Sequence, residues 1–384
     1  MNPYTLTELA LCFLKLGTLG FGGPIALAGY MQRDLVERRG WISKEDYLDG
    51  LALAQLAPGP LAAQLAMYLG WVKGRTWGAT VIGVAFVAPS FAMVLALSAA
   101  YLRFGGLSWM QGAFYGIGAA VIALIGRSAW KLIKLTLARD RLLWAIFGVL
   151  TAATAWAENE NIWLFLGSGV VVLLWRARRA PVPTAAAGVA PWLLSGLTGP
   201  ASWPLLGKMA WFFTTAGAVV FGSGLAIVPF LHGGVVKDFG WLNEQQFLDA
   251  VAVAMITPGP VVITVAFIGY LVAGPVGALV AALAVFLPCY LFVVIPAPYF
   301  RRYGKNRHVK GFVDGVSAAA TGAIAGATLV LGRRALLDAV TNAPKWPAVL
   351  LCAVTAVALW RVKKLPEPLV IAAAGVAGIA AQRL

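Results

Sequence analysis

Charged residues are scarce in this chain of 384 residues. Asp, Glu, Lys and Arg make up 12% of it, about half the fraction found in ordinary soluble proteins, while hydrophobic residues make up 60%. This composition excludes a water-solvated surface on a chain of this length. The hydrophobic stretches are separated by short charged loops and lack the alternation of barrel strands. The composition therefore predicts an all-α polytopic membrane protein.

Cysteine and histidine are also scarce. The three cysteines, Cys12, Cys289 and Cys352, are isolated in apolar segments, so neither a disulfide framework nor a metal site is predicted. His232 and His308 have no Cys or acidic ligand set near them in the sequence. No cofactor motif, nucleophile elbow or phosphate-binding loop ending in Lys-Ser or Lys-Thr is found. These shortages argue against an enzyme and against ATP hydrolysis.

Acidic residues are outnumbered, with 15 against 30 basic ones. The basic residues cluster beside apolar stretches rather than on a soluble domain. We therefore interpret the net charge of +15 as contact with anionic membrane lipid and control of topology, with no role for nucleic acid. The N-terminus lacks a basic region followed by a cleavage site, so no removable signal is expected. The oligomeric state stays open.

The most informative feature that is present is an internal repeat. The segment Phe13–Gly74 aligns without a gap on Phe213–Gly274, and after a one-residue deletion the match continues. A connector rich in Pro, Ala and Gly joins the copies. We predict a first repeat at residues 1–179, a connector at 180–204 and a second repeat at 205–384. The paired landmarks include Pro58-Gly59-Pro60 with Pro258-Gly259-Pro260, Asp49 with Asp249, and Pro89 with Pro288.

Each copy contains a segment that starts at a helix cap, at Ser43 in the first and Asn243 in the second. From Lys44 to Trp71 a continuous helix would be roughly 42 Å long, too long for one crossing of a 30 Å core and too short for two. The Pro-Gly-Pro break divides it into two pieces of roughly 20 Å. This length predicts a re-entrant helical hairpin, which enters the membrane and returns to the same side.

The distribution of basic residues tests that interpretation. A re-entrant hairpin leaves about five crossings per half, an odd number that inverts the second half relative to the first. With this topology the basic residues divide between the two sides at roughly four to one, as the positive-inside rule requires. We therefore favour inverted repeats. The expected crossings are residues 6–30, 76–101, 109–130, 142–157, 161–175, 209–230, 277–299, 312–332, 346–360 and 366–382.

The Pro-Gly-Pro breaks are the first candidate site. They fall midway along their segments, so they should lie at membrane depth, where half-helix ends facing a cavity attract anions. A packing kink is the alternative. We expect substrate contacts from the residues of both breaks, namely Pro58, Gly59, Pro60, Pro258, Gly259 and Pro260. Polar side chains close to them in sequence, Gln55, Gln64, Thr257 and Thr264, can donate hydrogen bonds to an oxyanion.

Glycine clusters inside the first span of each half are the second candidate. Gly20, Gly22 and Gly23 in the first copy are echoed by Gly222, Ser223 and Gly224 in the second. Such glycines often serve close helix packing, but they can also unwind the helix. If they approach the breaks, four interrupted segments surround one site near the midplane.

Burying a divalent anion requires a positive charge. Lys15 lies inside the first span and is the leading candidate, although its repeat partner is Thr215. Lys73, Arg75 and Arg127 are candidates for attracting anions at the cytoplasmic side, with a role in topology as the alternative. The matched carboxylates Asp49 and Asp249 are candidates for proton coupling, with interfacial placement as the alternative.

These motifs resemble the chromate ion transporter family, in its long two-domain form. The similarity rests on Phe13–Pro24, on Gly40-Trp41 through Asp49, and on Gln55–Pro60, each with a weaker echo in the second half. The second copy departs from the first with Ser223 for Gly23, Gly224 for Pro24 and Thr257 for Ala57. The resemblance implies export of chromate from the bacterial cytoplasm, with sulfate as a chemical look-alike.

A secondary active oxyanion transporter in the bacterial inner membrane is therefore the leading hypothesis, with a proton or another ion as the coupling partner. An uptake carrier for sulfate or another inorganic anion and a passive anion channel remain as alternatives. A membrane-embedded enzyme is the weakest of these. The sequence leaves open the direction of transport, the coupling ion and the choice between chromate and sulfate.

Overall fold

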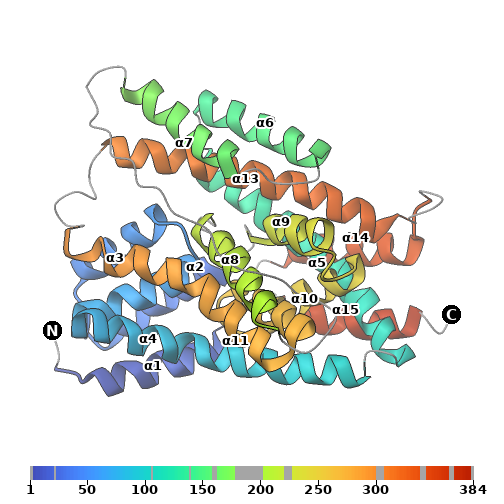
Figure 1. The fold of residues 1–384 in the computed structure, drawn as a ribbon, viewed down its shortest axis with the longest axis horizontal. Coiled ribbons are helices and arrows are strands. Elements are labelled where there is room, and N and C mark those ends of the chain that lie inside the picture. The colour runs from blue at the N-terminus through green and yellow to red at the C-terminus, as the bar shows by residue number, and fades with distance from the viewer. Residues whose placement is uncertain are drawn as a thin grey trace.

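The computed structural model describes residues 3–20, 23–104, 107–137, 140–157, 162–177, 202–219, 227–299, 307–337, 343–362 and 367–381. Helices dominate these residues, which confirms the expected all-α class (Figure 1). The first half contains α1 (Leu6–Leu19), α2 (Gly23–Met31), α3 (Lys44–Leu56), α4 (Leu61–Phe104), α5 (Ser108–Thr136), α6 (Arg141–Ala157) and α7 (Ile162–Ala177). The second contains α8 (Trp203–Val219), α9 (Ile227–His232), α10 (Glu244–Ile256), α11 (Thr264–Val294), α13 (Arg307–Leu336), α14 (Trp346–Arg361) and α15 (Glu367–Ala381).

Both predicted helix caps are confirmed. The Ser43 side chain accepts a hydrogen bond from the Asp46 backbone N–H at the start of α3, and the Asn243 side chain does the same for Gln246 at the start of α10. These bonds satisfy backbone donors that the first helical turn leaves without partners. A short π-helical turn precedes each cap, at Gln32–Arg38 and at Gly233–Asp238. The two halves therefore share an unusual local structure as well as a sequence pattern.

The first glycine cluster interrupts its helix, as one of the two interpretations predicted. α1 ends at Leu19, Gly20 is extended with φ −83° and ψ 91°, and α2 starts at Gly23. In the second half α8 ends at Val219 and α9 starts at Ile227. The predicted site residues Gly22, Gly222, Ser223 and Gly224 lie outside the described residues.

A kink separates the helix after each break from the long helix that follows it. In α4 the kink lies at Gly74 and Arg75, with φ of −140° and 53°. In α11 it lies at Ala273 and Gly274, with φ of −143° and 63°. Gly74 therefore corresponds to Ala273, and the ungapped alignment that pairs Gly74 with Gly274 is wrong by one residue at this point. The deletion lies between the break and the kink.

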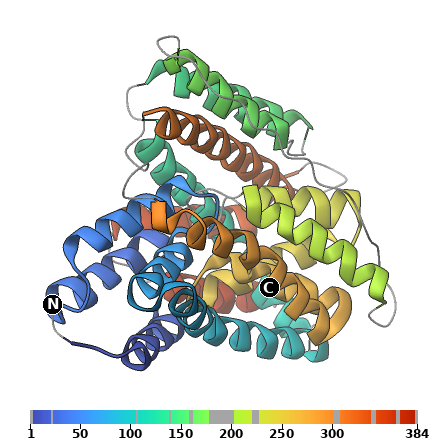
Figure 2. The ribbon, with the colours of Figure 1, turned by 60° about the vertical axis from the view of Figure 1, so that its left-hand side comes forward.

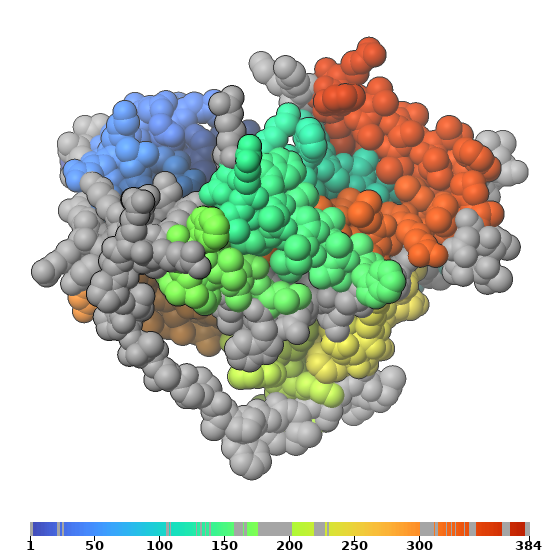
Figure 3. Space-filling model, turned by 90° about the horizontal axis from the view of Figure 1, so that it is seen from above, coloured from blue at the N-terminus to red at the C-terminus, as the bar shows by residue number. Residues whose placement is uncertain are grey.

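The helix segments that directly follow the breaks are buried, and the outer helices of each half pack on the other half. α1 packs on α4, and α8 packs on α11. The long helix α5 of the first half packs against α14 and α15 of the second, while α13 of the second half packs against α6 and α7 of the first (Figure 2). Figure 3 shows α6 and α7 on the surface, with orange helix of the second half beside them. Each half is therefore completed by the other.

The two kinked helices run in opposite directions. Figures 1 and 2 both show α4 progressing from left to right along the chain and α11 progressing from right to left. They touch at Thr80 and Tyr290, whose side-chain oxygens lie 2.8 Å apart. α5 and α13 are also antiparallel in Figure 1.

Four stretches within the described residues are long and apolar enough to cross a membrane: Leu61–Phe104, Trp109–Arg127, Val261–Tyr299 and Asp314–Arg333. Three shorter helices, Arg141–Trp156, Trp346–Arg361 and Leu369–Ala380, are also apolar. At 17 residues α6 is only about 25 Å long, which fits a tilted or partly embedded helix better than a perpendicular one. The fold thus has the helices of a polytopic membrane protein.

Candidate functional site

The second Pro-Gly-Pro break contacts the first half of the chain. The Gly259 backbone N–H donates to the Gly20 carbonyl oxygen at 3.1 Å, so the break in α10–α11 lies against the interruption in α1–α2. The Ser90 hydroxyl of α4 donates to the Pro258 carbonyl oxygen at 2.6 Å and lies 3.4 Å from the Gly17 carbonyl oxygen. Carbonyl groups that the broken helices leave unpaired thereby find donors from the other repeat.

The first break contacts the second half in a matching way. Cys289 of α11 follows Pro288 just as Ser90 follows Pro89. Its sulfur lies 3.1 Å from the position that a Cβ on Gly59 would occupy, and 3.7 Å from the Gly217 carbonyl oxygen of α8. Gly59 has φ +137° and Gly259 has φ +102°, conformations that side chains rarely adopt. Each break is thus a glycine-dependent turn packed on the opposite repeat.

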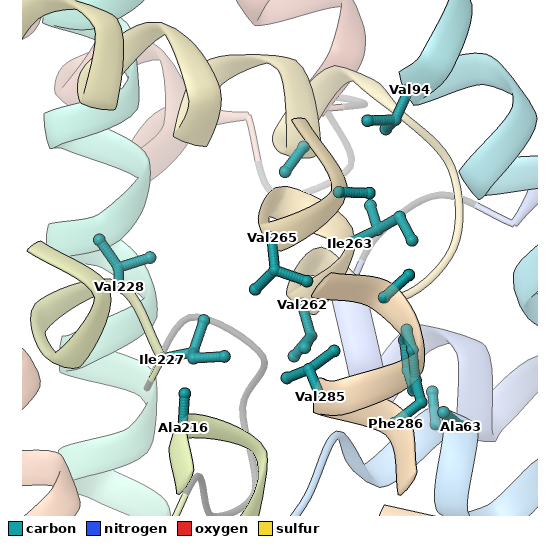
Figure 4. Close-up of a cluster of buried hydrophobic side chains, with 14 of the residues drawn as sticks. Ala63, Val94, Ala216, Ile227, Val228, Val262, Ile263, Val265, Val285 and Phe286 are labelled. Carbon is teal, nitrogen blue, oxygen red and sulfur yellow. The ribbon is translucent and has the colours of Figure 1, made fainter. Parts of the chain in front are cut away.

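Apolar side chains from both halves surround these turns (Figure 4). In that view Ala63 of α4 lies beside Phe286 of α11, and Val94 of α4 points towards Ile263 after the second break. The polar side chains that contact the breaks, Gln64, Ser90 and Cys289, are neutral. Among the residues that the structure describes, no Lys or Arg side chain is buried. Helix ends and neutral donors, rather than a buried cation, therefore supply the polarity at the breaks.

Gln64 is the predicted residue that the structure places closest to a break. It is fully buried, and its amide nitrogen donates to the Pro58 carbonyl oxygen. Thr257 and Thr264 are also buried, but each donates its hydroxyl proton within its own segment, to Val253 and Val261. Gln55, in contrast, is exposed.

The predicted basic residues lie away from the buried breaks. Lys15 is exposed on α1, on the face opposite the buried Gly17, because residues two apart point to nearly opposite sides of a helix. Lys73 and Arg75 are exposed, and their charges lie over the rings of Tyr4 and Trp71 at 4.1 and 4.7 Å.

Arg127, in α5, is partly buried. None of the contacts described for the breaks involves it or the other predicted basic residues.

The two candidate coupling carboxylates differ in environment. Asp249 is only 3% exposed, and its oxygens accept hydrogen bonds from the Tyr101 hydroxyl at 2.7 Å and from the Gln245 amide at 2.8 Å. Asp49 is half-buried in the equivalent turn of α3. Tyr101 belongs to α4, so the Asp249 carboxylate is held across the boundary between the repeats.

His232 lies at the end of α9, and its acidic partner is 12 residues further along the chain. The fold brings Glu244 to it, with His232 Nε2 and Glu244 Oε2 2.8 Å apart. The residues between them form the turn from α9 to α10. Within the described parts of the chain, no cluster of three or more His, Cys, Asp or Glu side chains is suited to hold a metal ion.

Three residues of the site were not predicted as site residues from the sequence: Ser90, Cys289 and Tyr101. Ser90 and Cys289 directly follow the paired prolines Pro89 and Pro288, and that position in the repeat was the available signal. A small polar residue in an apolar helix is common, so only the fold distinguishes these two. Tyr101 carried no signal, since the residue at the matching repeat position is Phe300.

Comparison with known proteins agrees with this duplicated arrangement. The family described as chromate transporter matches the chain twice, at residues 7–173 and 207–379. A chromate transport protein of Cupriavidus metallidurans is 59% identical over 99% of this chain and 94% of its own length. A probable chromate transport protein of Synechococcus elongatus is 56% identical over 98% of this chain and 95% of its own.

A chromate transport protein of Pseudomonas aeruginosa is 32% identical over 98% of this chain and 92% of its own length. No solved structure matches the chain. The two family matches each contain one Pro-Gly-Pro break, and the relatives cover nearly the whole chain. This chain belongs to the chromate transporter family, a family of transporters rather than enzymes.

Proposed function

We propose that this protein is a secondary active transporter that exports chromate from the bacterial cytoplasm across the inner membrane. The names of the relatives support chromate as the substrate. The observation that carries a carrier mechanism is the crossed contact of the breaks: Gly259 bonds to Gly20 of the other repeat, and Gly59 lies against Cys289. Relative movement of the halves would alter both contacts together.

The breaks are also the proposed substrate site. Each places a helix start next to non-helical backbone in an apolar, buried setting, where the partial positive charge of a helix N-terminus favours an anion. In the first half, α4 starts at Leu61 directly after Pro60, and the Gln64 amide lies in its first turns. We assign the substrate contacts to the predicted residues of both breaks and of the glycine clusters.

We assign an inverted topology with a re-entrant hairpin in each half. α3 and α10 are both 13 residues long, about 20 Å, too short to cross the membrane. Gly50 of α3 packs against Tyr68 after the break, as the two arms of a hairpin would. The opposite directions of α4 and α11 support inversion (Figure 1).

Topology is testable with single cysteines in a cysteine-free background. Ser43→Cys and Asn243→Cys should be labelled by an impermeant maleimide from opposite sides of the membrane. Labelling of both from the same side excludes the inverted topology. Ser43 is half-buried and Asn243 is exposed, so labelling of each variant in detergent gives the reference for local accessibility.

Proton coupling is assigned to Asp249, with Asp49 as its weaker counterpart. The Tyr101 hydroxyl can donate to an ionised carboxylate or, after rotation, accept from a protonated one, so both states of Asp249 keep a partner. Burial makes the state of this group sensitive to movements of the halves.

Transport itself is tested with labelled chromate in everted vesicles, under an imposed pH gradient and with sulfate as competitor. A carrier gives saturable flux and counterflow, whereas a passive channel gives neither. An uptake carrier for sulfate would favour sulfate and would run inward in intact cells. Chromate uptake no greater than in vesicles without the protein would refute the proposal.

A further inference from the structure

The first break contains a buried acceptor with no partner. Gln64 is 0% exposed, and the Pro58 carbonyl oxygen can only accept, so the Gln64 amide nitrogen must face it. The assignment of nitrogen and oxygen is thereby decided by chemistry. Gln64 Oε1 is then left buried, with no hydrogen-bond partner among the described residues.

An acceptor of this kind is unfavourable unless a donor reaches it. It sits within the first turns of α4, where the Ala63 and Gln64 N–H groups already bond to the Pro60 carbonyl oxygen and the preceding N–H groups of the helix point towards the break. The same small volume therefore offers backbone donors and one side-chain acceptor. A fully ionised oxyanion satisfies the donors but repels Oε1, because all its oxygens only accept.

The absence of buried positive charge is a second, independent constraint on the anion that can enter. The polar side chains at the breaks are neutral, and none of the described Lys and Arg residues is buried. The cost of burying an ion rises with the square of its charge, so without a buried cation a monoanion enters far more readily than a dianion.

We propose that the first break selects the singly protonated form of its oxyanion, whose O–H group donates to Gln64 Oε1 while its other oxygens face the start of α4. This inference rests on the proposed function and names the species that is carried. Chromate takes up a proton close to neutral pH, whereas sulfate does so only in strong acid. Two dianions of nearly the same shape are then distinguished by the proton that only one of them carries.

The protonation state of the transported chromate is tested by measuring initial chromate uptake into everted wild-type vesicles at a series of pH values. Ionophores hold the pH equal on both sides and clamp the membrane potential, so that the driving force stays constant. Above the second ionisation of chromate, KM for total chromate should rise by about tenfold per pH unit and stay constant when expressed as the monoanion. A KM that is constant in dianion concentration overturns the inference.

Two inhibitors separate the proton on the substrate from titration of the protein. The inhibition constant of sulfate, which stays a dianion, should not change over this pH range; a change parallel to that of chromate would mean that a protein group titrates, and would overturn the inference. Perchlorate is a tetrahedral monoanion with no proton to donate. It should inhibit poorly, and strong inhibition by perchlorate would mean that charge alone is recognised.

The role of Gln64 is tested with Gln64→Leu, with Gln111→Leu as the control at an exposed glutamine of α5. Gln64→Leu should raise KM for chromate at least about tenfold and strengthen inhibition by perchlorate, since the acceptor is gone. Unchanged inhibition by perchlorate excludes Gln64. If the variant fails to insert, the wild-type measurements still decide the species. Absence of any wild-type chromate flux refutes the proposed function instead, whereas flux with a pH-independent KM refutes only this inference.

Discussion

The two Pro-Gly-Pro breaks are equivalent turns of the two repeats, but their hydrogen-bond partners differ. At the second break the Ser90 hydroxyl donates to Pro258, and Gly259 donates to Gly20. At the first break the matching residue is Cys289, a weak donor, and Gln64 keeps one buried oxygen without a partner. At the second break the described polar groups are thus paired across the halves, whereas the first break keeps a buried acceptor without a partner. Under the proposed function, we therefore expect the first break to make the selective contact with the substrate and the second break to contribute more to stability.

The largest expected effect on stability comes from replacing the glycine of a break. Gly259→Ala would place a Cβ 2.0 Å from the Ser90 oxygen, at φ +102°. Backbone strain and the displaced Ser90 hydroxyl should together cost about 3 kcal/mol or more. We expect little folded protein, measured as membrane abundance and as melting temperature in detergent.

Gly29→Ala in α2 is the matched control, because no atom lies within 4 Å of the added Cβ. It should stabilise the helix by about 0.5–1 kcal/mol. Equal melting temperatures for the two variants would mean that the close contact at Gly259 is unimportant.

The partners of the breaks give the next effect in size. Ser90→Ala removes the donor to a buried carbonyl group and should cost about 1–3 kcal/mol. Cys289→Ala removes a thiol that donates to the Val285 carbonyl oxygen of its own helix at 3.1 Å and lies 3.7 Å from the Gly217 carbonyl oxygen, and it should cost about 1 kcal/mol or less. Thermal melting of both variants checks the order of the two losses in stability. An equal loss would contradict the view that the second break is the more firmly paired of the two.

The matched carboxylates Asp249 and Asp49 extend the comparison of the two halves to proton-coupled transport. Asp249→Asn keeps the shape of the side chain but cannot accept from both Tyr101 and Gln245 in the same way, and it cannot carry a proton. It should lower chromate flux driven by a pH gradient several-fold while leaving counterflow exchange nearly intact. Asp49→Asn, at a half-buried position, should have a smaller effect on driven flux. Equal losses in driven flux and in exchange would indicate damage to the fold rather than to coupling.

Local features of the fold were predictable because they depend on residues close in sequence. The caps at Ser43 and Asn243 and the glycine interruption after Leu19 follow from side-chain chemistry and backbone freedom alone. The one-residue error near Gly74 arose because Arg75 occupies a conformation with φ 53°, where the second copy has Gly274. A sequence alignment pairs the two glycines, whereas the backbone pairs the two residues of positive φ.

Contacts between the halves were beyond prediction. Which break meets which repeat depends on the way α4 and α11 cross, and repeat symmetry permits contact within a half as readily as between halves. Ser90 bonding to Pro258 therefore required the fold. The buried environment of Asp249 likewise depends on Tyr101, which the matching half replaces with Phe300.

The smallest expected effect concerns Lys15, which the sequence favoured as a counter-charge and whose repeat partner is Thr215. The structure places Lys15 on the exposed face of α1, where a long side chain can extend its charge towards the membrane surface. Thr215 instead bonds to the Trp211 carbonyl oxygen within α8.

If the substrate enters as a monoanion, the breaks need no charge from Lys15. Lys15→Met should then change KM for chromate by less than about twofold, since it disturbs no buried contact. Transport assays at matched protein levels check this, with Lys15→Arg as the charge-preserving control. A large rise in KM for Met but not for Arg would restore Lys15 as the counter-charge, and with it a dianion as the transported species.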